Sequence, residues 1–121
     1  MGRMLIVRHG ETAWNAEGRI QGHSDIELSE LGVLQARAVA DRLANTHIDA
    51  AYSSDLVRAS ETAKMILGGH RGVELNQFHL LRERYYGVFE GLTVDERRNR
   101  FPGMFNASLV KNLDFAPTEG E

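Results

Sequence analysis

A histidine stands between an arginine and a glycine near the start of the chain, in the tripeptide Arg8-His9-Gly10. Neutral imidazole is a competent nucleophile towards phosphorus near neutral pH, and a guanidinium group offers paired N–H donors that match phosphate oxygens. The glycine leaves room for a substrate to approach closely. These residue types in this order indicate that His9 accepts a phosphoryl group and that Arg8 binds it, rather than that His9 is a structural histidine.

Two charged residues further along the chain could complete this chemistry. Arg58 falls in the first turn of a predicted helix, where its charge would join the backbone amides in holding an anion. On an exposed helix face, Arg58 could instead pair with Asp55 or Glu61, so the residues alone leave its role open. Glu83 is a candidate acid for protonating the leaving oxygen, and the alternative for it is a solvated surface position.

The elements that must position these residues are short strands alternating with amphipathic helices. Residues 4–7, 48–52 and 73–75 are predicted to be short strands, the last with the weakest pattern. Residues 4–7 are apolar without alternation, which predicts burial on both faces. Gly32 would let the first helix approach the sheet closely. Three helices are predicted. The first is capped by Ser29 and reaches about Asn45, and the second is capped by Ser53, Ser54 or Asp55 and runs to Gly68 and Gly69. The third is opened by Thr93 with Glu96 and stopped by Pro102.

This alternation predicts an α/β fold in which three layers, helix, sheet and helix, surround a mostly parallel central sheet. Ligands of such folds bind outside the carboxyl ends of the strands, and Arg8, His9 and Arg58 all fall at that edge. No linker divides the chain, so we expect one domain over residues 1–121.

Composition excludes several classes of function. The 121 residues contain no cysteine, which removes disulfides and thiolate zinc sites, and a net charge of −3 does not favour nucleic acid as a partner. No two histidines have the spacing of a helical zinc site, and we predict no metal. The apolar run at residues 4–7 is far shorter than a signal-peptide core or a membrane span, so we expect a cytoplasmic protein without membrane contact.

The motifs resemble, block by block, those of the histidine phosphatase superfamily, which includes the cofactor-dependent phosphoglycerate mutases. The resemblance covers nearly the whole chain and keeps the family's order, which makes it far more specific than Arg-His-Gly alone. Its blocks are residues 5–12, 14–15, 21–22 and 28–32, then 53–59 and 62–63, then 81–83, 87 and 90–91, and finally 117–121.

The resemblance implies a phosphoglycerate mutase-like fold and a role for each matched residue. His9 would be the nucleophile, Glu83 the proton donor, and Arg8, Arg58 and Asn15 the residues that bind phosphate. Thr12, Gln21 and Gly22 would belong to the substrate pocket. The family also has a second essential histidine beyond its fourth block, and we therefore expect these 121 residues to form the front portion of the fold, incomplete at the carboxyl end.

Three functions are compatible with this sequence. The first is a phosphomonoester phosphatase with a phosphohistidine intermediate, the second a phosphoglycerate mutase, and the third an inactive, truncated phosphate-binding remnant. The stretches at residues 23–25 and 93–102 resemble the family's broad phosphatases more than its mutases and favour the first. We expect a small-molecule phosphate ester as substrate and a possible homo-oligomer. We expect no cofactor for a phosphatase, whereas the mutase alternative would require 2,3-bisphosphoglycerate.

Overall fold

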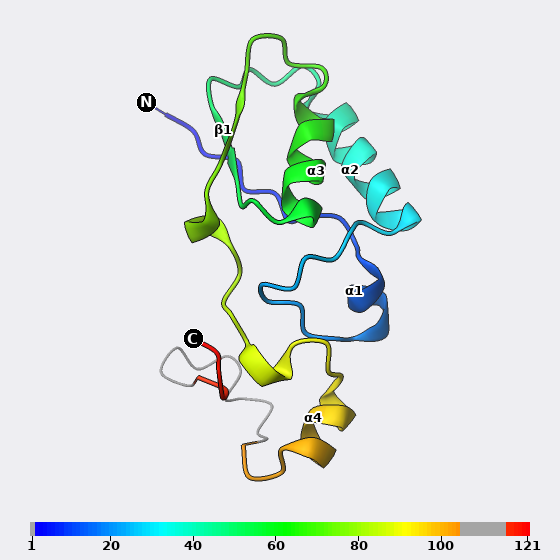
Figure 1. Ribbon diagram of the computed structural model, residues 1–121. Coiled ribbons are helices and arrows are strands. Elements are labelled where there is room, and N and C mark those ends of the chain that lie inside the picture. Colours follow the sequence, from blue (N-terminus) through cyan, green and yellow to red (C-terminus); the bar gives the residue numbers. More distant parts are fainter. Residues whose placement is uncertain (1, 105–115) are drawn as a thin grey trace.

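The protein is described by a computed structural model, which covers residues 2–104 and 116–121. Helices and short strands alternate along these residues (Figure 1). In chain order they are α1 (Ala13–Glu17), α2 (Glu30–Leu43), β1 (Ala51–Ser53), α3 (Val57–Leu67), β2 (Leu75–Gln77), the 3-10 turns η1 (His79–Leu81) and η2 (Gly87–Phe89), and α4 (Val94–Arg100).

The strands and the two longer helices form the upper body of the molecule. β1 and β2 pair as parallel strands, with Ala51 opposite Leu75 and Ser53 opposite Gln77. α3 follows β1 and packs against both strands, and α2 packs along α3 on the same side of the sheet (Figure 1). This is the predicted α/β fold with a parallel sheet. The described residues supply the sheet and one helix layer of the expected three-layer arrangement.

Helix α2 begins where the sequence predicts and approaches a neighbouring segment very closely. Ser29 caps it by accepting the Gly32 amide at 3.1 Å, and the Ser29 amide donates to the Glu11 carbonyl at 2.8 Å. A side chain on Gly32 would collide with the Glu11 backbone, and one on Gly10 would collide with the Gly32 carbonyl. The close approach therefore joins α2 to the loop that follows His9, not to a strand.

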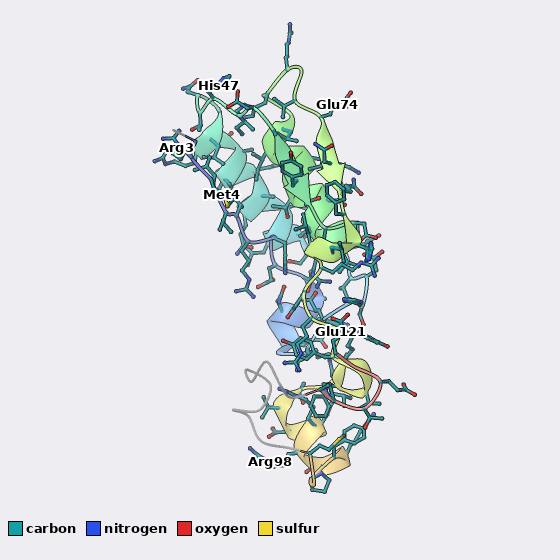
Figure 2. The ribbon with its side chains drawn as sticks, turned by 90° about the vertical axis from the view of Figure 1, so that its left-hand side faces the viewer. Arg3, Met4, His47, Glu74, Arg98 and Glu121 are labelled. Atoms are coloured by element: carbon teal, nitrogen blue, oxygen red, sulfur yellow. The ribbon has the colours of Figure 1, made fainter. Side chains whose placement is uncertain are left out.

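The N-terminal segment departs from prediction. Residues 4–7 have no strand assignment, and Met4 and Ile6 are 82% and 87% exposed. Figure 2 shows Met4 at the edge of the molecule. A strand requires a hydrogen-bonded neighbour and burial requires packed layers on both faces. Among the described residues no segment pairs with residues 4–7, so their apolar pattern is not converted into a buried strand.

The start of α3 is capped differently from expectation. Its N-cap residue is Leu56, which makes no side-chain cap bond, so none of Ser53, Ser54 and Asp55 caps this helix. Instead, Asp25 accepts the Val57 amide at 2.8 Å, and Asp55 pairs with Arg82 at 2.6 Å. A carboxylate brought in from a distant loop has replaced the local cap.

The lower body is built around Phe89, which is 1% exposed and lies 5.8 Å from the Phe101 ring. The predicted capping box opens α4, because Thr93 accepts the Glu96 amide and Glu96 accepts the Thr93 amide. The last residues of the chain return to η2, where Thr118 accepts the Val88 amide at 3.0 Å. None of the described helices is long and apolar enough to cross a membrane.

Gly32→Ala tests the close approach of α2. Alanine improves helix propensity by about 1 kcal/mol, but its Cβ would meet the Glu11 backbone, which cannot rotate away as a side chain can. The experiments use the protein expressed from its complete coding sequence, termed the complete gene product. In urea titrations of this protein we expect the free energy of unfolding to fall by about 1–3 kcal/mol. Gly69→Ala, whose Cβ would meet nothing within 4 Å, should change it by less than about 0.5 kcal/mol. A Gly32→Ala protein as stable as the wild type would contradict the packing.

Candidate active site

The His9 ring is oriented by its own neighbour. Nδ1 lies 2.7 Å from the Gly10 carbonyl oxygen. Because a carbonyl can only accept, Nδ1 carries the proton of this hydrogen bond. The neutral ring then has its lone pair on Nε2, the nitrogen that points away from the backbone bond. The side chain is half-buried and has one nucleophilic nitrogen.

One threonine hydroxyl connects the loop after His9 to helix α3. The Gly10 amide donates to Thr62 Oγ1 at 3.1 Å, and Thr62 Oγ1 donates to the Arg58 carbonyl at 2.7 Å. Both bonds are buried. The segment that carries the predicted nucleophile is thereby fixed to the turn of α3 that carries the predicted phosphate-binding arginine.

The Arg58 side chain is 2% exposed and its guanidinium group is held by two backbone carbonyls. Nη1 donates to the Ser24 carbonyl at 2.8 Å and Nη2 to the Gly22 carbonyl at 2.7 Å. Glu83 lies at 3.4 Å from Nη2, a long and therefore weaker contact. The two carbonyls, not Glu83, set the plane of the group. The alternative pairings of Arg58 are absent, because Asp55 pairs with Arg82 and Glu61 with Lys64.

The surroundings of His9 and Arg58 shift both pKa values downwards. Burial lowers the pKa of His9, the Gly10 hydrogen bond raises it, Arg58 and Arg8 lower it, and Glu83 raises it. Burial also lowers the pKa of Arg58, against the raising effects of nearby carboxylates, of which Glu83 is the largest. A guanidinium remains charged near neutral pH, whereas the imidazole is kept neutral. This is the pairing that phosphoryl acceptance by His9 requires.

Arg8 and Glu83 are the two predicted site residues whose side chains are open to solvent. Arg8 is exposed, and Glu83 is 46% exposed. Arg8 and His9 line a shallow cavity of about 200 Å³ with Gly10, Gln35, Ala36, Val39 and Thr62. A larger hollow of about 340 Å³ lies beside His47, His70 and Arg71 and contains none of the matched motifs. We assign the smaller cavity to the site, because Arg8 and His9 line it.

Asn15, Thr12 and Gln21 lie in a separate buried cluster at the start of α1. The Thr12 amide donates to Asn15 Oδ1 at 3.0 Å, and the Asn15 amide donates to Thr12 Oγ1 at 3.2 Å, which forms a capping box. The Thr12 hydroxyl lies 2.5 Å from Gln21 Oε1. Thr12 is fully buried and Gln21 is 4% exposed. In this structure these three residues brace the loop before Gly22, and their predicted phosphate or substrate contacts stay predictions.

The loop of His9 is linked to Arg58 through Thr62, Arg58 lies 3.4 Å from Glu83, and the charges of Arg8, Arg58 and Glu83 all act on the His9 imidazole. That these four residues share one phosphate site stays a prediction. The structure also shows three residues whose importance to this geometry the sequence analysis missed, namely Thr62, Asp25 and Glu90. Each forms its hydrogen bond across a long sequence separation. The sequence feature that could have pointed to these residues is their position within or beside the matched blocks. Among residues 2–104 and 116–121, no group of three or more side chains is arranged to hold a metal ion, and the metal-free reaction stays a prediction.

Comparison with known proteins gives this geometry its context. Residues 4–121 match the family model described as the histidine phosphatase superfamily (branch 1). Two Arabidopsis thaliana relatives are the phosphoglycerate mutase-like protein 4, 45% identical over 92% of this chain and 49% of its own length, and a metal-independent phosphoserine phosphatase, 43% identical over 98% of this chain and 50% of its own. The chain thus spans about half the length of these relatives.

A solved structure shares the fold as well. A mycobacterial glucosyl-3-phosphoglycerate phosphatase in complex with VO3 superimposes with a TM-score of 0.84 and is 36% identical. The superposition covers 93% of this chain and 53% of the mycobacterial one. The arrangement of helices and strands described above is therefore shared with that mycobacterial phosphatase over the superimposed residues.

A titration of His9 tests the electrostatics of the site. We expect the His9 Cε1–H signal, identified by its loss in His9→Asn, to report a pKa below the ordinary value of about 6.5. Glu83→Gln should lower this pKa further, because the carboxylate raises it. A His9 pKa at or above about 6.5 would contradict the burial of the ring.

The same shift has a defined effect on stability. Unfolded His9 takes up its proton at a higher pH than folded His9, so acidification through the window between the folded pKa and about 6.5 should lower the free energy of unfolding. His9→Asn should lack this part of the pH dependence.

Proposed function

Because this chain belongs to the histidine phosphatase superfamily, we propose that it carries the phosphoryl-acceptor site of a phosphomonoester phosphatase that works through a phosphohistidine intermediate. The observation that supports this most is the hydrogen bond from His9 Nδ1 to the Gly10 carbonyl at 2.7 Å. It leaves Nε2 as the free nucleophilic nitrogen beside a buried guanidinium group.

In the proposed reaction, His9 Nε2 forms a bond to the phosphorus atom while the bond between phosphorus and the ester oxygen breaks. Arg58 and Arg8 stabilise the negative charge on the three remaining oxygens. Glu83 donates a proton to the departing alkoxide, which leaves as an alcohol. Glu83, now ionised, then takes a proton from the water that attacks the phosphohistidine, and phosphate leaves while the neutral imidazole is restored.

The substrate class in this proposal is a small-molecule phosphate ester. The relatives' names support this choice, because they refer to phosphoserine and to glucosyl-3-phosphoglycerate. Vanadate, which the mycobacterial protein holds, is a common mimic of the phosphoryl group in transfer. The exposure of Glu83 and Arg8 leaves the leaving-group side open, where loops rather than the phosphate clamp would set specificity.

The proposal also covers cofactors, cellular location and self-association. A reaction without metal or other cofactor is supported by the name of the metal-independent phosphoserine phosphatase and by a site that provides its own charge and acid. Cytoplasmic location and self-association follow only from the sequence expectations. A phosphoglycerate mutase is the second candidate, supported by the mutase-like relative, and it alone would need 2,3-bisphosphoglycerate.

Turnover of the complete gene product tests this function. We expect hydrolysis of a generic aryl phosphate and release of inorganic phosphate, with ³²P-labelled protein trapped by rapid denaturation at alkaline pH, where phosphohistidine persists. His9→Ala should abolish both turnover and label. Isomerisation of 3-phosphoglycerate without hydrolysis would favour the mutase, whereas absence of both turnover and label would favour a phosphate-binding remnant. Label that survives in His9→Ala would contradict the nucleophile.

The role of Glu83 is tested by changing the leaving group. Glu83→Gln should lower kcat/KM for an alkyl phosphate by roughly 10²–10³-fold, because an alkoxide needs a proton to depart. For p-nitrophenyl phosphate, whose leaving group departs as a stable anion, the loss should be less than about tenfold. Glu61→Gln, the same change at an exposed position paired with Lys64, should affect neither ester. Equal losses for both esters in Glu83→Gln would contradict the role of general acid.

A further inference from the structure

Glu90, at the end of η2, holds the loop formed by Gly22, His23 and Ser24, here termed the 22–24 loop. Its Oε1 accepts the His23 amide at 2.6 Å, and its Oε2 accepts the Ser24 hydroxyl at 2.6 Å. The Tyr86 amide also approaches Oε1, at 3.4 Å. Short hydrogen bonds to an ionised carboxylate are the stronger kind, so Glu90 is a firm anchor for this loop.

Gly22 makes this anchor possible. Its φ of +54° is a conformation that side chains disfavour. A Cβ on Gly22 would also collide with Glu90 Oε1 and lie 2.9 Å from the Arg84 carbonyl. Two independent constraints therefore require glycine here, and one of them is the carboxylate itself.

The same loop holds Arg58 from its other side. The Gly22 carbonyl and the His23 amide belong to one peptide unit, which is planar, so their directions are fixed relative to each other. The amide donates to Glu90 and the carbonyl accepts from Arg58 Nη2 at 2.7 Å. Ser24 adds a second link, because its hydroxyl donates to Glu90 and its carbonyl accepts from Arg58 Nη1 at 2.8 Å, although these two groups do not share one peptide plane.

Both carbonyls that orient the guanidinium group are therefore anchored by one carboxylate. Glu90 makes no hydrogen bond to Arg58 among the described contacts, although its charge opposes the lowering of the Arg58 pKa by burial. Glu83, the carboxylate that does touch Arg58, is more weakly placed at 3.4 Å. The hydrogen-bonded connection from Glu90 to Arg58 therefore runs through the 22–24 loop.

We propose that Glu90 is a positioning residue for phosphoryl transfer, which fixes the plane of the Arg58 guanidinium group through the Gly22–His23 peptide and Ser24. This inference rests on the proposed function, in which Arg58 binds the transferred phosphoryl group. The bidentate match between guanidinium and phosphate oxygens depends on the orientation of that plane. Glu90 therefore acts on catalysis through Arg58 alone.

A double-mutant cycle in the complete gene product tests this coupling. Glu90→Ala should lower kcat/KM for an aryl phosphate by roughly 10–100-fold, as expected for a misplaced binding group. Arg58→Ala should lower it by roughly 10²–10³-fold, and adding Glu90→Ala to Arg58→Ala should change it by less than about threefold. Glu90→Gln should retain activity within a few fold, since an amide can accept from the His23 amide and donate to Ser24 Oγ.

Glu96 provides the matched control. Its carboxylate also accepts a backbone amide, that of Thr93 at 3.1 Å, and pairs with Arg19 at 2.6 Å, but it has no contact with the 22–24 loop among the described residues. Glu96→Ala should lower the melting temperature while leaving kcat/KM unchanged. A merely structural role of Glu90 would give the Glu96 pattern, and a loss from Glu90→Ala that is equally large with and without Arg58 would overturn the proposal.

A second readout does not depend on turnover. The Nη protons of Arg58, buried and held by two carbonyls, should exchange slowly with solvent in ¹⁵N-arginine-labelled wild type and in Glu96→Ala. In Glu90→Ala they should exchange at least about tenfold faster. Unchanged exchange in Glu90→Ala would overturn the positioning role even if the wild-type protein were inactive. If the wild-type protein shows no turnover, this result would instead count against the proposed function alone.

Discussion

A buried guanidinium group must have its N–H donors satisfied, and this requirement organises the site around Arg58. The side chain is 2% exposed, and burial of an unpaired charge of this kind is strongly unfavourable. The 22–24 loop supplies the missing acceptors with two carbonyls rather than a tight carboxylate pair. Carbonyls compensate the donors without neutralising the charge. The positive field therefore remains available for an anion.

Hydrogen bonds between segments distant in sequence also fix the loops of the site in place. Thr62 fixes the loop of His9 to α3, Asp25 fixes the 22–24 loop to the first amide of α3, and Glu90 fixes it to η2. The loop of His9 and the segment at residues 22–25 are thus both bonded to α3, and η2 is bonded to the 22–24 loop. Electrostatic catalysis benefits when donors are already oriented, because no reorganisation is then required during the reaction.

The sequence predicted features that depend on neighbouring residues and missed those that depend on distant ones. The Ser29 cap and the box of Thr93 and Glu96 were correct because each bond spans three residues. The cap of α3 was wrong because Asp25 reaches Val57 across 32 positions, which no local spacing reveals. Burial of residues 4–7 was wrong for a related reason, since burial is a property of the neighbours that a segment finds. The sequence analysis placed His9 and Arg58 at one strand edge, but no strand precedes His9 among the described residues, and the carbonyls that hold Arg58 were not predicted.

We propose that His9, Arg8 and Arg58 surround one tetrahedral anion. A crystal structure of the complete gene product soaked with orthovanadate tests it most directly. Vanadium should be bonded to His9 Nε2, with its oxygens about 2.7–3.2 Å from the guanidinium nitrogens of Arg8 and Arg58. Vanadate bound elsewhere, or the three side chains directed into separate cavities around an empty site, would contradict it.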